Sequence, residues 1–162
     1  MLFRISLIAG FVVPAGAGKR VLVRAVGPGL TPFGVTGVLA QPVLQLQSGS
    51  TVVAQNTNWT TSADRDAITA GSSQSGAFAL SAGDSALIAT LAPGNYTVLV
   101  TGVGATSGIA LIVVNINIDY RHPATMNDEL VIETSVKSVG NRSSALPPGR
   151  TIRSNTACFA FF

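Results

Sequence analysis

The sequence predicts an all-β fold: a jelly-roll-like β-sandwich with one short helix and extended terminal strands. Three observations favour this fold. The apolar residues stand in short β-branched runs, Gly, Pro, Asn and Ser separate these runs, and only 10% of the 162 residues are charged while 47% are hydrophobic. Short strands with closely spaced turn residues are typical of sandwiches and barrels. We expect residues 1–120 to form the sandwich module and residues 121–162 to form a strand-forming C-terminal extension.

The strands are predicted from alternation and from turn residues at their ends. They are expected at residues 3–13, 19–26, 42–47, 51–56, 77–80, 85–91, 95–102, 108–120 and 129–139, with a further strand in the final segment TIRSNTACFAFF. In KRVLVRAV (19–26), Val21 and Val23 should face one way, and Leu22 and Arg24 the other, because successive side chains of a strand alternate between its two faces.

Two segments between the strands have their own signals. Residues 27–34 contain two prolines, which lack ladder donors, so an ordered loop is expected there, with Leu30 and Phe33 in the core. One short helix is predicted at 63–70, ended by Gly71.

The N-terminus permits two interpretations. A basic residue, an apolar stretch and a small-residue site within residues 1–17 fit a signal peptide. The same residues fit a first β-strand bounded by Pro14, and we favour the strand.

The composition argues against several function classes. The net charge is +3 and the basic residues are scattered, whereas nucleic-acid binding needs a clustered basic surface. A single Cys excludes an internal disulfide, and no apolar run approaches the ~20 residues of a membrane-spanning helix. His122, the only histidine, has no partner His or Cys nearby and is expected to be a solvated loop residue. We therefore expect no catalytic residues, no cofactor and no bound metal, and predict that the protein is not an enzyme.

Two stretches resemble a known family. The stretches GFVVPAGAGKRVLVRAVGPGLTPFGVTGVLAQPVLQLQSGSTVVAQNTNW (10–59) and LAPGNYTVLVTGVGATSGIALIVV (91–114) are similar to a β-rich repeat module of large secreted bacterial surface proteins. RAVGP and PGNYTVLVTGVG are the most specific parts of the likeness. The resemblance implies a non-catalytic, extracellular or cell-surface unit that often occurs in tandem.

The lone Trp59 suggests a binding surface. Together with Asn56 and Asn58 it could contact a sugar ring, which would make the chain a carbohydrate-binding or adhesion module. The alternative is a half-buried Trp that closes one end of the sandwich. Asp64 and Asp66 offer fewer carboxylates than a calcium site usually needs.

The apolar terminal strands suggest self-assembly. A strand given to a neighbouring subunit completes that subunit's sheet, and a head-to-tail exchange that does not close builds a filament. We therefore predict a structural subunit of an extracellular assembly, a homo-oligomer or filament; in the alternative, both strands fold back within their own chain. The residues expected to make the assembly contacts are Ile5, Leu7, Val12, Ile152, Phe159, Phe161 and Phe162.

Overall fold

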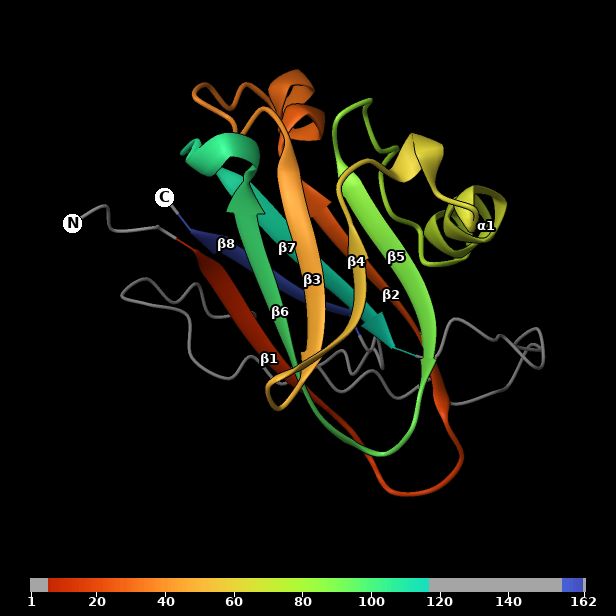
Figure 1. Cartoon of the computed structure of the whole chain (residues 1–162). Helices are drawn as coiled ribbons and strands as arrows, with labels where there is room; N and C mark the ends of the chain where they lie inside the picture. The colour runs from red at the N-terminus through yellow and green to blue at the C-terminus, as the bar shows by residue number, and fades with distance from the viewer. Residues whose placement is uncertain (1–5, 117–155, 162) are drawn as a thin grey trace, which may run out of the picture.

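The computed structural model, which describes residues 6–116 and 156–161, contains two antiparallel four-stranded sheets (Figure 1). The first sheet contains, in spatial order, β1 (Leu7–Val13), β6 (Gly94–Gly102), β3 (Pro42–Ser48) and β4 (Thr51–Asn56). The second contains β5 (Ser85–Leu91), β2 (Lys19–Val26), β7 (Ala110–Ile116) and β8 (Thr156–Phe161). The prediction of a mostly-β, antiparallel fold with a short helix is confirmed for the described residues.

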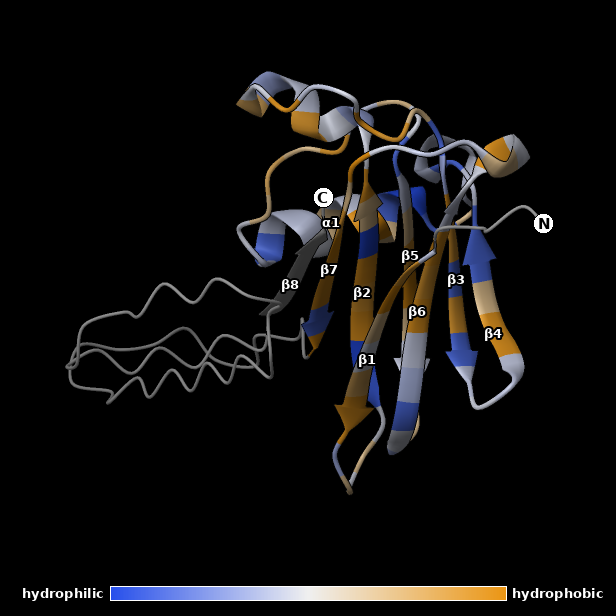
Figure 2. Ribbon diagram, turned by 90° about the vertical axis from the view of Figure 1, so that its left-hand side faces the viewer, coloured by the Kyte–Doolittle hydropathy of each residue, from blue (hydrophilic) through white to orange (hydrophobic). Residues whose placement is uncertain are grey.

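One apolar core lies between the two sheets. Its side chains alternate with outward-facing ones along each strand, which gives the strands the banded hydropathy of Figure 2. The central strands of both sheets supply many of its buried members: Val21 and Val23 of β2, Leu44 and Leu46 of β3, Val98 and Val100 of β6, and Ile112 and Val114 of β7. The faces predicted for residues 19–26 are therefore confirmed.

A second, smaller cluster covers the outer face of the second sheet. Leu22 of β2 and Ala86 of β5 pack there against Ile68 of the helix α1 (Arg65–Gln74), and all three are fully buried. In Figure 1, α1 lies beside β5 on that side of the molecule. β2 is therefore covered on both faces, by the opposite sheet and by the helix.

The helix is longer than predicted. Gly71 does not end it, because the N–H of Ser75 still donates to the carbonyl of Gly71 at 3.0 Å. The chain turns away at Gly76, whose φ of 65° lies in the left-handed region that glycine adopts readily. The glycine at which the chain leaves the helix therefore lies five residues after Gly71, the glycine expected to end it.

The strand predicted at residues 77–80 is absent from both sheets. The guanidinium of Arg24 donates a hydrogen bond to the carbonyl of Phe78, so a side chain occupies a backbone acceptor that a strand would use in its ladder. Phe33, expected in the core, is 63% exposed at the end of the 3-10 helix η1 (Pro28–Phe33). Its ring packs edge-on against Phe78, 5.0 Å between centroids, outside the main core.

Both terminal strands pair within the chain. β1 pairs with β6 at the edge of the first sheet, and β8 pairs with β7 at the edge of the second. The first predicted strand begins at Leu7 in the structure, and the strand expected at 108–120 is seen as Ala110–Ile116. The strand expected at 129–139 lies outside the described residues, and the division of the chain at residue 120 stays a prediction. Among the described residues, no helix is long and apolar enough to cross a membrane.

Candidate functional site

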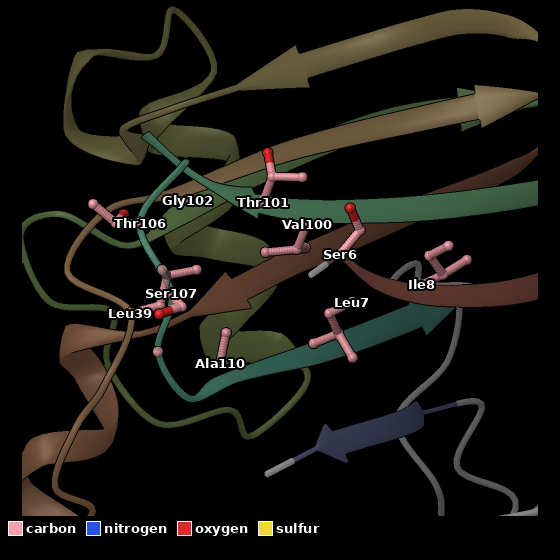
Figure 3. A pocket seen from close by; sticks show the side chains of 11 residues that line it. Ser6, Leu7, Ile8, Leu39, Val100, Thr101, Gly102, Thr106, Ser107 and Ala110 are labelled. Carbon is pink, nitrogen blue, oxygen red and sulfur yellow. The ribbon is translucent and has the colours of Figure 1, made fainter. Parts of the chain in front are cut away.

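One pocket of the described structure opens at one end of the two sheets, where β1 lies near the start of β7 (Figure 3). Its volume is about 420 Å³, within the range of small-molecule sites. Side chains and backbone from four separate parts of the chain line it: Ser6, Leu7, Ile8, Leu39, Val100, Thr101, Gly102, Thr106, Ser107, Gly108 and Ala110.

The pocket has an apolar floor, and its rim carries both hydroxyl groups and the exposed apolar side chain of Ile8. Leu39, Val100 and Ala110 are buried, with exposed fractions of 4%, 2% and 5%. Ser107 is exposed and Thr101 is half-buried, so hydroxyl groups stand nearer to solvent than the floor does. The described lining contains no charged side chain. Such a site suits a ligand with an apolar body and a neutral polar end.

Backbone hydrogen bonds hold one wall of the pocket in place. The N–H of Leu39 donates to the carbonyl of Ile109 at 2.8 Å, and the N–H of Ile109 donates to the carbonyl of Gly37 at 2.9 Å. The N–H of Val103 donates to the carbonyl of Gln41 at 3.1 Å. Segments 37–41 and 103–109 are therefore tied together, and the pocket between them and β1 is preformed.

Two glycines allow this close approach. A Cβ on Gly102 would lie 2.8 Å from Cδ1 of Leu39 and closer still to Thr106, and a Cβ on Gly108 would lie 2.6 Å from the backbone nitrogen of Leu39. Neither distance is compatible with a side chain in the present backbone arrangement. Any larger residue at these positions must displace the wall.

Trp59 has a structural role. Its Nε1–H donates to the carbonyl of Ser81 at 2.9 Å, and its half-buried ring packs against the cluster formed by Leu22, Ile68 and Ala86. The ring also lines a smaller pocket, of about 210 Å³, between α1 and residues 77–80. The ring is half-buried, as the alternative considered above has it, but it packs on the outer face of the second sheet and does not close an end of the sandwich.

Asn56 and Asn58 are also engaged within the chain. Oδ1 of Asn58 accepts hydrogen bonds from the N–H of Thr60 at 2.9 Å and from its hydroxyl at 2.7 Å, which caps the 3-10 helix η2 (Trp59–Thr61). Nδ2 of Asn56 donates to the carbonyl of Asn58 at 3.2 Å, and its Oδ1 accepts from the N–H of Ala86 at 3.2 Å. Both amides thus fix the loop around Trp59.

The residues predicted to make assembly contacts are spread over both edge strands. Leu7 lines the pocket, and Val12, also on β1, is 62% exposed. Phe159 and Phe161 belong to β8, while Ile5, Ile152 and Phe162 lie outside the described residues. No finding tests contacts of these residues between subunits.

Two buried charged residues were not foreseen. Arg24 and Asp84 are both fully buried, which neither the scattered distribution of the basic residues nor the alternation of the strands predicted. The signal available for Arg24 was its position in an alternating strand, on the face shared with Leu22. Within the described ranges, no group of three or more His, Cys, Asp and Glu side chains could hold a metal ion. His122 lies outside these ranges.

The sequence model of the thioesterase superfamily matches residues 76–146. This segment is similar to that family. It covers less than half of the chain and includes β5, β6 and β7. No curated protein and no solved structure matches the chain.

The match overturns four of the expectations drawn from the sequence. The resemblance to a repeat module of bacterial surface proteins was wrong, since the family found over the second of the two stretches is the thioesterase superfamily. The prediction of a non-enzymatic structural subunit that forms filaments was wrong, and so was its alternative, a carbohydrate-binding or adhesion module. The descriptions of the protein as structural, filament-forming and secreted find no support.

The reason for these errors is physical. Alternating apolar runs with turn residues report a packed antiparallel sheet, and they do not distinguish an enzyme from a structural module. The scarcity of ionisable groups was also given too much weight. Hydrolysis needs one well-placed general base and groups that stabilise a developing charge, which few residues can supply.

Proposed function

We propose that this protein hydrolyses acyl thioesters and that its acyl group binds in the pocket between β1 and β7. One observation supports this most directly: the segment similar to thioesterases supplies most of the pocket's lining. Seven of the eleven lining residues fall within it, namely Val100, Thr101, Gly102, Thr106, Ser107, Gly108 and Ala110.

The reaction in this proposal is hydrolysis of a carbon–sulfur bond. A general base takes a proton from water while the water oxygen attacks the thioester carbonyl carbon, and the carbon–sulfur bond then breaks. The products are a carboxylic acid and a thiol, whose sulfur receives the proton. The hydroxyls of Thr101 and Ser107 near the mouth are candidate donors to the carbonyl oxygen, whose negative charge grows during the attack.

The general base is not Asp84. Its carboxylate is fully buried and accepts hydrogen bonds from the backbone N–H groups of Gly27, Gly29 and Ser81. The other ionisable candidates in the matched segment lie outside the described residues: Asp119, His122, Asp128, Glu129 and Glu133. We propose that one of these groups activates the water.

The test is release of free thiol from a series of acyl-coenzyme A substrates by the purified full chain. Five variants follow from the proposal: Asp119→Asn, His122→Gln, Asp128→Asn, Glu129→Gln and Glu133→Gln. One of them should lower kcat by about a hundredfold or more, the usual contribution of a positioned general base. Asp66→Asn, on the exposed side of α1, is the control. Thiol release at the buffer rate for every chain length, or full activity in all five variants, would contradict the proposal.

Three further features of the protein, its fold type, its oligomeric state and its location, are proposals as well. We infer a β-sandwich, supported by the single core that the two sheets share, while the jelly-roll-like connectivity stays a prediction. A homo-oligomer without a nucleic-acid partner stays a prediction that sedimentation can test. An extracellular or cell-surface location also stays a prediction.

A further inference from the structure

We propose that the outer face of the first sheet is the contact surface of a homodimer, in which two copies of this chain pack face to face around a two-fold axis. The outward side chains of β1, β6, β3 and β4 form this face. The inference goes beyond the proposed function and does not rest on it, because the oligomeric state is measured without any substrate.

The four strands of this sheet carry no charged side chain at any position. The charged side chains of the described residues all lie on β2, on and just before α1, or just before β5: Lys19, Arg20, Arg24, Asp64, Arg65, Asp66 and Asp84. A sheet face in water usually presents polar residues, and charges such as Lys usually protect edge strands from association. Because the first sheet lacks this protection on both edges, its outer face has the character of a covered surface.

The strand register shows how the face is composed. Two rows of residues, paired directly from strand to strand, cross its middle: Ile8, Leu99, Gln45 and Gln55 in one row, and Gly10, Thr97, Gln47 and Val52 in the next. Apolar side chains and uncharged polar side chains therefore alternate over the whole width of the sheet.

The edges of this face expose large apolar side chains. Four of the six exposed large hydrophobic residues in the described part of the chain lie on its edge strands, Ile8 and Val12 on β1 and Val52 and Val53 on β4. In Figure 1 the first sheet lies toward the viewer, and no described element crosses its outer face. Contiguous exposed apolar surface of this kind marks interaction sites, because its burial against another molecule is favourable.

The absence of charge favours a second copy over a charged partner. A charged surface packed against this face would lose its hydration and find no opposite charge, which is costly. A second copy brings an equally uncharged face. Nε2 of Gln45 donates to Oε1 of Gln55 at 2.9 Å, and Nε2 of Gln47 donates to Oε1 of Gln45 at 3.5 Å. Since a side-chain amide both donates and accepts, these amides can also pair with the same amides of a second copy.

The face is large enough for a modest dimer. Its four strands, six to nine residues long, give an outline of roughly 19 Å by 23 Å at the usual strand spacing and rise. Two copies enclose roughly 900 Å² by outline alone, and the relief of the side chains brings the contact to the ~1,000 Å² of small specific interfaces. A two-fold contact uses the face of each copy once, so association stops at two chains.

Sedimentation equilibrium of the full chain tests the proposal. Between about 1 and 200 µM, a dimer should form with a Kd in the micromolar range or below. Because no charges meet in the contact, this Kd should change by less than about threefold between about 50 and 500 mM NaCl. A monomer at every concentration would overturn the proposal. A dimer that dissociates at the higher salt concentration would place the contact on the charged surface and would overturn it as well.

Two matched variants locate the contact. Thr97 faces outward from the central strand β6, and Thr69 is exposed on α1. Thr97→Lys puts a charge into the middle of the contact and should raise the Kd of the dimer at least about a hundredfold. Thr69→Lys adds the same charge away from the face and should leave the Kd unchanged. Equal dimerisation of the two variants, both verified as folded by circular dichroism, would overturn the proposal.

A second position keeps the test decisive if Thr97→Lys does not fold. Val12 is exposed at the edge strand β1, so Val12→Lys should fold and should also weaken the dimer, by at least about tenfold. A Kd that stays unchanged in Val12→Lys would overturn the assignment of this face.

Mixing two charge variants tests the two-fold arrangement. In a face-to-face dimer, the middle of one face lies against the middle of the other, so Thr97→Lys and Thr97→Glu should each be monomeric alone and should form a mixed dimer together. If the mixture stays monomeric while both single variants are folded, the two central strands do not face each other, and the proposed arrangement is wrong.

Discussion

Oδ1 of Asp84 accepts a hydrogen bond from the backbone N–H of Gly27 at 2.9 Å, across 57 residues of sequence. The same oxygen accepts from the N–H of Gly29 at 3.1 Å, and Oδ2 accepts from the N–H of Ser81 at 2.7 Å. The carboxylate thereby fixes the end of β2 beside the beginning of β5. Gly27 in turn lies so close to Leu39 that a Cβ there would collide with the Leu39 carbonyl, so this arrangement also supports the segment that forms the pocket floor.

Replacing Asp84 should therefore destabilise the protein strongly. Asp84→Ala removes the acceptor for three backbone N–H groups, two of which are in buried contacts, and should lower the free energy of unfolding by about 3 kcal/mol. Asp84→Asn keeps one carbonyl oxygen as an acceptor and should therefore lower the free energy of unfolding by less than Asp84→Ala does. Urea unfolding, followed by the fluorescence of the single Trp, measures the change. Asp66→Ala on the exposed side of α1 is the control, and an equal loss in both Ala variants would refute this role.

The buried Arg24 should not tolerate replacement by lysine. Its guanidinium lies 4.7 Å from the centre of the Phe78 ring and donates to the Phe78 carbonyl. A planar guanidinium can stack on a ring and donate at once, whereas an ammonium group lacks this geometry. Arg24→Lys should lower the free energy of unfolding by about 2 kcal/mol. Arg65→Lys, at an exposed position of α1, should change it by less than about 0.5 kcal/mol, and a similar effect of both would contradict this explanation.

Trp59→Phe should have a moderate effect. The substitution keeps an aromatic ring against the outer cluster and removes the Nε1–H that donates to the Ser81 carbonyl. The expected loss in the free energy of unfolding is about 1 kcal/mol, the usual net value of one such hydrogen bond. Thermal unfolding followed by circular dichroism measures it, because the variant has no Trp. Unchanged stability would show that the hydrogen bond contributes nothing.

Structural features that depend on neighbouring residues could be predicted from the sequence, whereas features that depend on contacts between distant residues could not. The faces of β2 and β3 follow from neighbouring residues, so Val21, Val23, Leu44 and Leu46 could be placed in the core by alternation alone. Phe33 could not be placed correctly, because its partner Phe78 is far away in the sequence and lies outside the sheets. The length of α1 was missed because a glycine inside a helix and one that ends it look alike in the sequence.

The pocket is the least local feature of all. Its lining comes from the start of β1, from Leu39, from the end of β6 and from residues 106–110, which only the pairing of strands brings together. The one signal in the sequence is the stretch TGVGATSG (101–108), whose small residues permit a close backbone approach. The same stretch belongs to the part of the chain that was attributed to a different family, and its small residues alone could not indicate an acyl ligand.

The two strand glycines Gly102 and Gly10 provide a matched test of the pocket wall. In β6, a Cβ on Gly102 would lie 2.8 Å from Cδ1 of Leu39 and closer to Thr106, so the wall must shift to admit it. In β1, a Cβ on Gly10 would meet the Tyr96 carbonyl at an ordinary 3.8 Å. Gly102→Ala should therefore lower the free energy of unfolding by about 1–3 kcal/mol. Gly10→Ala should leave it unchanged or raise it by about 0.5–1 kcal/mol, because alanine loses less conformational freedom on folding.

Gly102→Ala and Gly10→Ala should also differ in their affinity for decanoic acid. The displaced wall in Gly102→Ala should weaken decanoic acid binding, whereas Gly10 does not line the pocket and Gly10→Ala should bind normally. Calorimetry under conditions in which both variants are fully folded makes the comparison independent of the stability difference. If Gly102→Ala proves less stable and yet binds decanoic acid as the unmodified chain does, the close approach of Gly102 to Leu39 matters for folding and does not shape the ligand site.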